Sequence, residues 1–420
     1  MSAEAKKEEP GIFRELYSTF FSKSWHMWIG SVVLAILSIY LFIIWKPWGS
    51  SGGILNWGQN LFNFLGVSFS NSAPNGLLKW FESPYAMLSI MVVMGALASA
   101  LLAKEFAIRV APGGELFKGL LGGLLMGVGC IIGFGCTIGN FFSGWAALSG
   151  GAIIFVIGLI IGVFFAVKYL LWEMEKHPKM SSGKSSTFLQ AKTKGASLQP
   201  LAGIIVVVIA LAIPFLFYDA GSMYGELLVN GKLELTVEGI TLIGFIIIGL
   251  LIGIVLQRSR WCIVRALREP FMTGDAEPAV AIIAGLIIGL LGFTVLKIMD
   301  ASLESIMVAA NFWMPAIIGG IIFGFGMTIA GGCTVGSSWR AGEGHVKLWF
   351  SLIGIIIAAP LTAEYIRPAF LNILPSWMKQ QVFLPDYFSY LGAIIIMLLI
   401  LLIWYIFVKW NERTGRFSAM

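Results

Sequence analysis

Two cysteines stand in nearly the same local sequence at two distant places in this chain. Residues 122–139 are GGLLMGVGCIIGFGCTIG and residues 319–336 are GGIIFGFGMTIAGGCTVG, with nine of the eighteen aligned positions identical. The second copy lies 197 positions further on and aligns Cys136 with Cys333 and Thr137 with Thr334 without a gap. Thiols, hydroxyls and backbone groups at a helix start can together hold a small anion. In apolar surroundings, such a duplicated motif is typical of a transport pathway built from two related halves.

The glycines around these cysteines predict breaks in the helices that carry them. They occupy matching positions, Gly135 and Gly139 in the first copy and Gly332 and Gly336 in the second. Each glycine inside a helix costs about 1 kcal/mol relative to alanine, so the GGC motifs favour broken or re-entrant helices. A helix that restarts there directs its positive end into the pathway, which suits an anion. The alternative is close helix packing, with the cysteines as small buried apolar residues. We favour packing for the glycines earlier in each copy, such as Gly129 and Gly326.

A third cysteine, Cys262, lies among four arginines, Arg258, Arg260, Arg265 and Arg268. Arginines beside a thiol lower its pKa and attract anions, but the same pattern also fits an inert thiol in a basic loop. Arg340 pairs either with an anion or with Glu343, and we favour Glu343. Cys130 is interpreted as a packing residue. The four cysteines have no CxxC spacing and no neighbouring histidine cluster, so no metal site, disulfide framework or other cofactor is expected.

Composition identifies an integral membrane protein. The 420 residues are 58% hydrophobic and 12% charged, and their mean hydropathy is +0.88. The net charge of +6 falls in short loops and indicates no nucleic-acid partner. Ten apolar runs are long enough to cross a bilayer, and they are predicted at Trp28–Trp45, Ala86–Ala103, Leu120–Gly139, Ala152–Leu171, Leu201–Phe217, Gly239–Leu256, Val280–Met299, Pro315–Ile329, Leu348–Tyr365 and Tyr390–Val408.

Basic residues collect in alternate loops, including those around Lys118 and from Arg258 to Arg268. The positive-inside rule then predicts that both termini are cytoplasmic. The spans that carry the two GGC motifs run in opposite directions, which predicts an all-α protein of two inverted five-segment repeats. The expected division is a cytoplasmic N-terminal segment (1–26), a first repeat (27–172), a cytoplasmic linker (173–199) with a span (200–217) that closes the first repeat, a second repeat (218–408) and a cytoplasmic tail (409–420).

Three segments resemble the YeeE/YedE family of bacterial inner-membrane proteins, closer to its YedE branch. They are GFGCTIGNFFSG at 133–144, QRSRWCIVRALREPFMTG at 257–274 and the stretch at 319–349 that begins GGIIFGFGMTIAGGCTVG. The resemblance covers most of the chain. It implies inward transport of a sulfur-containing anion, most simply thiosulfate, past single cysteines without net chemistry. The residues that match the family's path are Cys136, Cys262, Cys333, their flanking glycines named above, and Arg258, Arg265 and Arg340, while Thr137 and Thr334 add hydroxyl donors.

The resemblance leaves other functions open. The YedE branch is also associated with selenium metabolism, so the substrate is alternatively a selenium species. Some members work beside a TusA-like sulfurtransferase, which would be a separate chain here. A rival of another class is a membrane sulfurtransferase in which Cys262 becomes persulfidated, although the sequence offers no obvious base beside it.

Overall fold

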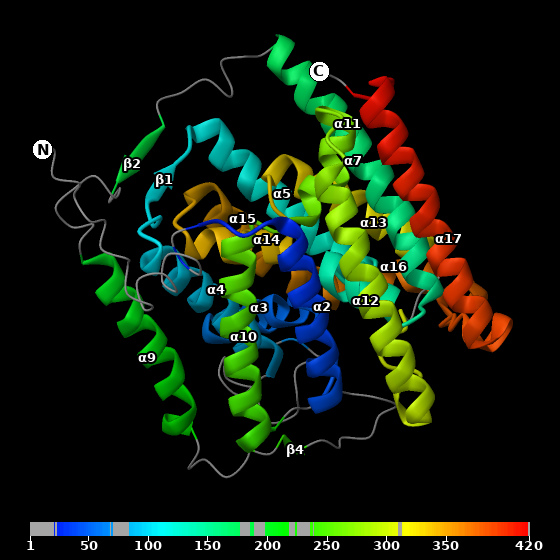
Figure 1. Ribbon diagram of the computed structural model, residues 1–420, viewed down its shortest axis with the longest axis horizontal. Coiled ribbons are helices and arrows are strands. Elements are labelled where there is room, and N and C mark those ends of the chain that lie inside the picture. Colours follow the sequence, from blue (N-terminus) through cyan, green and yellow to red (C-terminus); the bar gives the residue numbers. More distant parts are fainter. Residues whose placement is uncertain are drawn as a thin grey trace, which may run out of the picture.

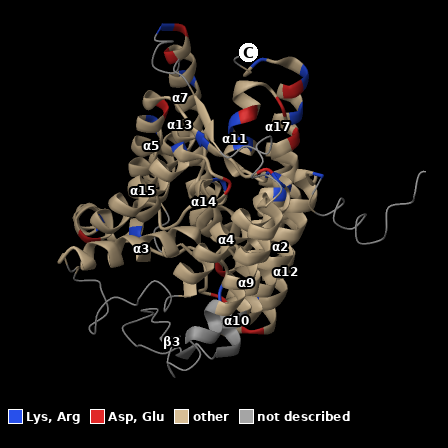
Figure 2. Ribbon diagram, turned by 90° about the vertical axis from the view of Figure 1, so that its left-hand side faces the viewer, with Lys and Arg blue, Asp and Glu red and all other residues tan. Residues whose placement is uncertain are grey.

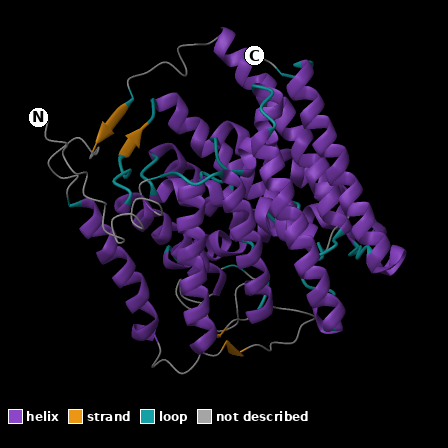
Figure 3. Ribbon diagram, viewed as in Figure 1, coloured by secondary structure: helices purple, strands orange, loops and turns teal. Residues whose placement is uncertain are grey.

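The computed structural model describes residues 21, 23–67, 69, 84–176, 185–188, 198–217, 223–224, 236–237, 239–309 and 313–418. Nearly all of these residues are helical (Figures 1 and 3). The strands in these ranges form two short antiparallel pairs. They are β1 (Ile108–Val110) with β2 (Ser186–Phe188), and β3 (Met223–Tyr224) with β4 (Thr236–Val237).

The helices fall into long and short ones. The long helices are α2 (Met27–Ile44), α4 (Pro84–Leu102), α5 (Gly113–Ile132), α7 (Gly150–Lys176), α9 (Gln199–Phe217), α10 (Gly239–Ser259), α12 (Glu277–Met299), α13 (Met314–Ala330), α15 (Val346–Leu361) and α17 (Pro385–Thr414). The short elements between them are α3 (Ser50–Phe64), η2 (Thr137–Ser143), α6 (Gly144–Ala146), α11 (Ile263–Met272), η5 (Ala301–Leu303), α14 (Thr334–Gly342), η6 (Thr362–Ile366), α16 (Arg367–Ile373) and η7 (Ser376–Lys379).

Nine helical stretches within the described ranges are long and apolar enough to cross a membrane. They are Met27–Ile44, Pro84–Leu102, Gly113–Ile132, Gly150–Lys176, Gly244–Met272, Glu277–Met299, Met314–Gly342, Val346–Ile373 and Pro385–Thr414. Nine of the ten predicted spans overlap these stretches. The tenth, Leu201–Phe217, falls on α9, whose described apolar part, Gln199–Ala212, is shorter. That span stays a prediction.

The prediction of loops at two basic segments is wrong. Lys118 lies inside α5 and is buried, because Glu173 of α7 accepts a hydrogen bond from its ammonium group at 2.8 Å and Glu115 pairs with it as well. The segment from Arg258 to Arg268 is the bend between α10 and α11 followed by α11 itself. The prediction assumed that charged side chains lie in water. A carboxylate partner from a distant helix, however, allows a cation to be buried.

The helices that carry the duplicated motifs cross at their glycines. A Cβ atom built on Gly122 would lie 2.5 Å from the carbonyl oxygen of Gly326, and one built on Gly326 would lie 2.7 Å from that of Gly122. Gly129 and Gly319 face each other in the same way, at 2.7 Å in both directions. Only glycine permits so close an approach of two backbones. The upstream glycines therefore have the packing role that was predicted for them.

Each of the two crossing helices also packs against a further helix from the other part of the chain. α5 packs against both α13 and α15, while α13 packs against both α5 and α7. Among the outer helices, α2 packs on α12 and α4 packs on α10. Each of these pairs joins a helix from before the predicted linker to one from after it. The core is consequently shared between the two parts of the chain and is not divided into two separate bodies.

Charged residues gather near helix ends, and the helix bodies are mainly uncharged (Figure 2). Large apolar side chains are exposed on α9, for example Leu201 and Val208, and on α17, for example Leu402 and Ile406. Exposed apolar helix faces are expected where lipid surrounds the protein. The described fold is thus that of a multi-pass membrane protein.

Candidate functional site

Both duplicated motifs break a helix and restart it at the cysteine, although η2 is a π-helix and α14 an α-helix. In the first copy α5 ends at Ile132 and η2 begins at Thr137, with Cys136 in the N-cap position. In the second copy α13 ends at Ala330 and α14 begins at Thr334, with Cys333 in the N-cap position. Each turn contains one glycine in a conformation that other residues rarely adopt. Gly135 has φ +149° and Gly331 has φ +83°.

Both cysteine sulfurs face the start of the helix that they cap. The N–H of Gly139 donates to Sγ of Cys136 at 3.5 Å. In the second copy the N–H of Gly336 is directed at Sγ of Cys333, and a Cβ built on Gly336 would lie 3.5 Å from that sulfur. The sequence thus places a thiol beside the positive end of a short helix twice.

The third cysteine also precedes a short helix. Cys262 is the N-cap of α11, after a bend in which Arg260 has φ +53°. A fourth short helix, α3, begins after Gly49, and the Cα of Gly49 is 3.4 Å from a Cβ built on Gly139. The sequence did not predict this contact of α3. Its residues include Asn56 and Asn60 and are not apolar enough to predict a span.

The three cysteines come together although they are far apart in the sequence. The Cys333 thiol is within electrostatic range of Cys262 and Cys136 and lies beside the Thr137 hydroxyl. Cys136 and Cys333 have no exposed surface, and Cys262 is 1% exposed. Each of these thiols is free of any disulfide. The fourth, Cys130, is buried within α5 and donates to the carbonyl oxygen of Gly127 at 3.3 Å. It is also within electrostatic range of Cys136.

Two equivalent hydroxyls beside the cysteines lack ordinary partners. Thr137 and Thr334 are completely buried. Within the described residues, neither Oγ1 atom has a nitrogen or oxygen partner at hydrogen-bonding distance. A buried hydroxyl without a partner costs free energy, so most buried polar groups in proteins are satisfied. Both copies of the motif therefore keep a buried hydroxyl directly after the cysteine, and that of Thr137 lies beside the Cys333 thiol.

The arginines near the cysteines have different surroundings. Arg258 is buried, pairs with Glu105 at 3.2 Å and donates to the carbonyl oxygen of Lys23 at 2.6 Å. Arg340 donates to the carbonyl oxygen of Gly331 at 2.9 Å. Its guanidinium carbon lies 5.1 Å from the centre of the Trp339 ring. Arg265 is half-buried and has no carboxylate partner among the residues that the structure describes. Among the described residues, neither Arg265 nor Arg340 has a carboxylate that neutralises its guanidinium group.

The favoured pairing of Arg340 with Glu343 is wrong. Glu343 is buried and accepts two hydrogen bonds from Arg260, at 2.6 and 2.7 Å. Arg260 also pairs with Glu105 at 3.0 Å. These contacts join the bend before α11 to the end of α4 and to the end of α14. Local sequence could not reveal them, because Glu105 and Glu343 are 155 and 83 residues from Arg260.

Glu343 makes the stability of the fold sensitive to acid. Burial alone would raise the pKa of its carboxyl, but contact with His345 and the charge of Arg260 outweigh burial and lower the pKa from 4.5 to about 2. Because the folded pKa is depressed, this stabilisation is present above pH about 4.5 and is lost as pH falls towards 2. The free energy of unfolding that is lost in this way is on the order of 3 kcal/mol.

We therefore expect the Glu343→Gln protein to be less stable than wild type at pH 7, and to lose less stability than wild type between pH 5 and pH 3. Unfolding temperatures in detergent across this range check the expectation. Glu412→Gln is the matched control, because Glu412 is an exposed acid paired with Lys409 on the same helix. Parallel acid curves for wild type and Glu343→Gln would contradict the assignment.

Comparison with known proteins places these features in a family. A family model described as sulphur transport matches residues 2–165 and 258–419. The chain is 26% identical over 396 residues to "Probable transporter YedE" of Escherichia coli (strain K12), which covers 92% of this chain and 93% of that protein. It is 25% identical over 410 residues to the protein of the same name from Salmonella typhimurium (strain LT2), 96% of each. "Thiosulfate transporter TsuA" of Escherichia coli (strain K12) is 32% identical over 112 residues, 27% of this chain and 31% of that protein.

Proposed function

The chain belongs to the sulphur transport family of membrane proteins, and from that premise we propose that it carries thiosulfate across the bacterial inner membrane into the cell. The family and the YedE relatives support a transporter of sulfur compounds. The partial similarity to TsuA supports thiosulfate in particular. The observation that carries the proposal is the convergence of Cys136, Cys262 and Cys333 beside the buried hydroxyls of Thr137 and Thr334.

Thiosulfate presents two kinds of surface, and this site has a partner for each. A divalent anion is very costly to bury in hydrocarbon, so its hydration must be replaced by fixed donors. The hydroxyls of Thr137 and Thr334 and the N–H groups at the starts of η2 and α14 suit sulfonate oxygens. A thiol is a weak donor with a soft sulfur, and it suits the terminal sulfur of the ion. Weak contacts also allow release, which conduction requires.

The proposed mechanism is a relay without net chemistry. The terminal sulfur of the ion passes from one thiol to the next by S–H···S contacts, first at Cys136 and then at Cys333 and Cys262. Arg265 and Arg340, which lack carboxylate partners, attract the anion. Arg258, whose charge is matched by Glu105, holds the bend before α11 and acts on the ion indirectly.

We further propose that the membrane domain is an inverted repeat of five plus five spans, with both termini in the cytoplasm. The reciprocal glycine contacts of α5 and α13 support this arrangement. The packing of α5 on α15 and of α13 on α7 supports it as well. In such an arrangement the two GGC motifs enter the membrane from opposite sides and meet near its middle.

Uptake of radiolabelled thiosulfate into proteoliposomes that contain the purified protein tests the proposal. We expect uptake above that of empty liposomes, with the Cys262 thiol unmodified afterwards by mass spectrometry. Uptake of selenium oxyanions without thiosulfate uptake would replace the substrate. A persulfide on Cys262 without any uptake would overturn transport in favour of the sulfurtransferase. For that reaction the sequence suggests no base beside Cys262, and Cys262 is 1% exposed.

A further inference from the structure

An apolar groove lies between α7, α12 and α17, and none of the four cysteines is among the residues that line it. Its first part is a cavity of about 380 Å³ that is lined by Ile157 and Ile160 of α7 and by Leu401, Trp404 and Phe407 of α17, with Leu267 of α11 at its base. Its second part, of about 420 Å³, shares Ile160, Trp404 and Phe407 with the first and continues to Phe417. Because the two parts share a wall, they form one continuous groove. Figure 1 shows α7 and α17 running along this side of the molecule with their C-terminal ends at the same end.

The groove has the length of one membrane leaflet. On α7 it extends from Ile153 to Phe165, which is about 18 Å of helix. The hydrocarbon core of a bilayer is about 30 Å thick, so one leaflet is about 15 Å. Its lining is apolar or aromatic throughout, and Phe165 and Ile403 at its edge are 57% and 66% exposed. A groove of this length and chemistry, open on its side to the membrane, fits an acyl chain.

One end of the groove carries cations that have no carboxylate partner. Nζ of Lys168 lies 4.6 Å from the centre of the Phe164 ring, and Phe164 lines the groove. Arg416 lies 5.8 Å from the Trp410 ring, which packs at 6.1 Å on the groove residue Phe417. Neither Lys168 nor Arg416 has an ion pair among the described residues. Two acids near this end have partners of their own, since Glu412 pairs with Lys409 and Glu277 with His26.

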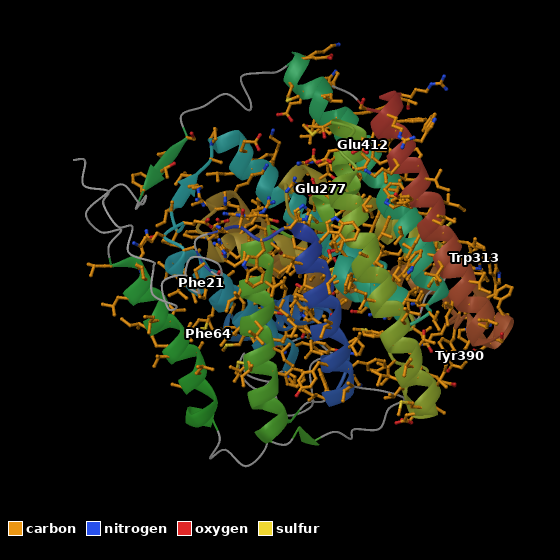
Figure 4. All side chains as sticks on the ribbon, in the orientation of Figure 1. Phe21, Phe64, Glu277, Trp313, Tyr390 and Glu412 are labelled. Carbon is orange, nitrogen blue, oxygen red and sulfur yellow. The ribbon has the colours of Figure 1, made fainter. Side chains whose placement is uncertain are left out.

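The opposite end of α17 has a different character. Asp386 begins the helix, and the hydroxyl of Tyr390 donates to Glu304 at 2.8 Å. In Figure 4 Tyr390 and Glu412 mark these two ends of the helix. Lys168 and Arg416 thus give one end of the groove its cations, whereas Asp386 and Glu304 lie at the other end of α17. A ligand with an apolar tail and an anionic head has one orientation in this groove.

We propose that an anionic phospholipid binds in this groove, with one acyl chain between α7 and α17 and its phosphate at Lys168 and Arg416. Basic groups beside a membrane helix attract anionic lipid heads, and burial of each CH₂ group adds to the affinity. The acyl chain of the lipid would occupy the space that separates α17 from α7. α17 is the least buried of the nine candidate spans within the described ranges. The site is distinct from the cysteine path and does not depend on what the protein transports.

Lipid titration of the purified full-length protein tests this site. Dioleoyl-phosphatidylglycerol added to the detergent-solubilised protein should raise its unfolding temperature by about 3 °C at about 100 times Kd, whereas dioleoyl-phosphatidylcholine should raise it much less. Native mass spectrometry gives the stoichiometry, and one tightly bound lipid is expected. Equal shifts with the two lipids would overturn the proposal.

Two variants separate the tail and head of the site. Ile160→Trp fills the wall that both parts of the groove share and should abolish the phosphatidylglycerol shift. Lys168→Ala with Arg416→Ala should weaken the lipid about 30-fold, while Lys104→Ala with Lys379→Ala, two basic residues outside the groove, should leave affinity unchanged. Retention of the full shift in the Lys168 and Arg416 variant would overturn the proposal even if Ile160→Trp fails to fold. A dimer that Ile160→Trp dissociates would show that a second copy occupies the groove and would overturn it as well.

Discussion

Cys333→Ala protein in proteoliposomes is expected to take up thiosulfate about 100-fold more slowly than wild type. The thiol is completely buried and lies within electrostatic range of both other path cysteines. Its removal therefore interrupts the relay at the residue that connects them. A hydrogen bond to a charged group contributes about 1.5–3 kcal/mol, and a loss of that size in the barrier region slows passage by one to two orders of magnitude. Initial rates of uptake of labelled thiosulfate, at matched protein content, provide the measurement.

The chain offers its own control for this experiment. Cys130 is also buried, but it bonds to Gly127 of its own helix, so Cys130→Ala should transport at close to the wild-type rate. Cys333→Ser keeps a donor but replaces the soft sulfur and should remain strongly impaired. If Cys333→Ala were as fast as Cys130→Ala, the family assignment would stand and the cysteine relay would not. Loss of uptake in both variants would indicate damage to folding instead.

The candidate site was predictable from the sequence where the signal was local and duplicated. Cys136 and Cys333 stood out because a repeat without gaps aligned cysteine, threonine and glycine together. The predicted role of Cys130 also agrees with its single bond to its own helix.

What the sequence could not provide was the set of long-range charge partners. Arg258 and Arg260 differ by two positions and look equivalent in the sequence. One is 1% exposed and the other is 39% exposed at its side chain. The difference depends on Glu105 and Glu343, which reach the bend from other helices. For the same reason the span predicted from Leu120 was placed too late, since α5 begins at Gly113. Nothing in the local sequence showed that Glu173 would accept a hydrogen bond from Lys118.

Gly319→Ala is expected to destabilise the protein by about 3 kcal/mol or more. A Cβ at this position would lie 2.5 Å from the Cα of Gly133 and 2.7 Å from the carbonyl oxygen of Gly129. Both are backbone atoms, which cannot rotate away as a side chain can, so α5 and α13 would have to separate. Gly289→Ala is the matched control in α12, because its Cβ would meet Ala146 at an ordinary 3.5 Å. That change should be neutral or slightly stabilising. Unfolding temperature and the monodisperse fraction in detergent measure both.

The crossing also makes a prediction about its own symmetry. Gly129 faces Gly319 across the same crossing, and a Cβ on Gly129 would lie 2.6 Å from the backbone nitrogen of Phe323. Gly129→Ala should therefore cost as much as Gly319→Ala. Because either change forces the same separation of α5 from α13, the double variant should cost less than the sum of the two. Additive costs would mean that the two glycines are accommodated independently. In that case the reciprocal contacts would lose their weight as support for two halves built around a common axis.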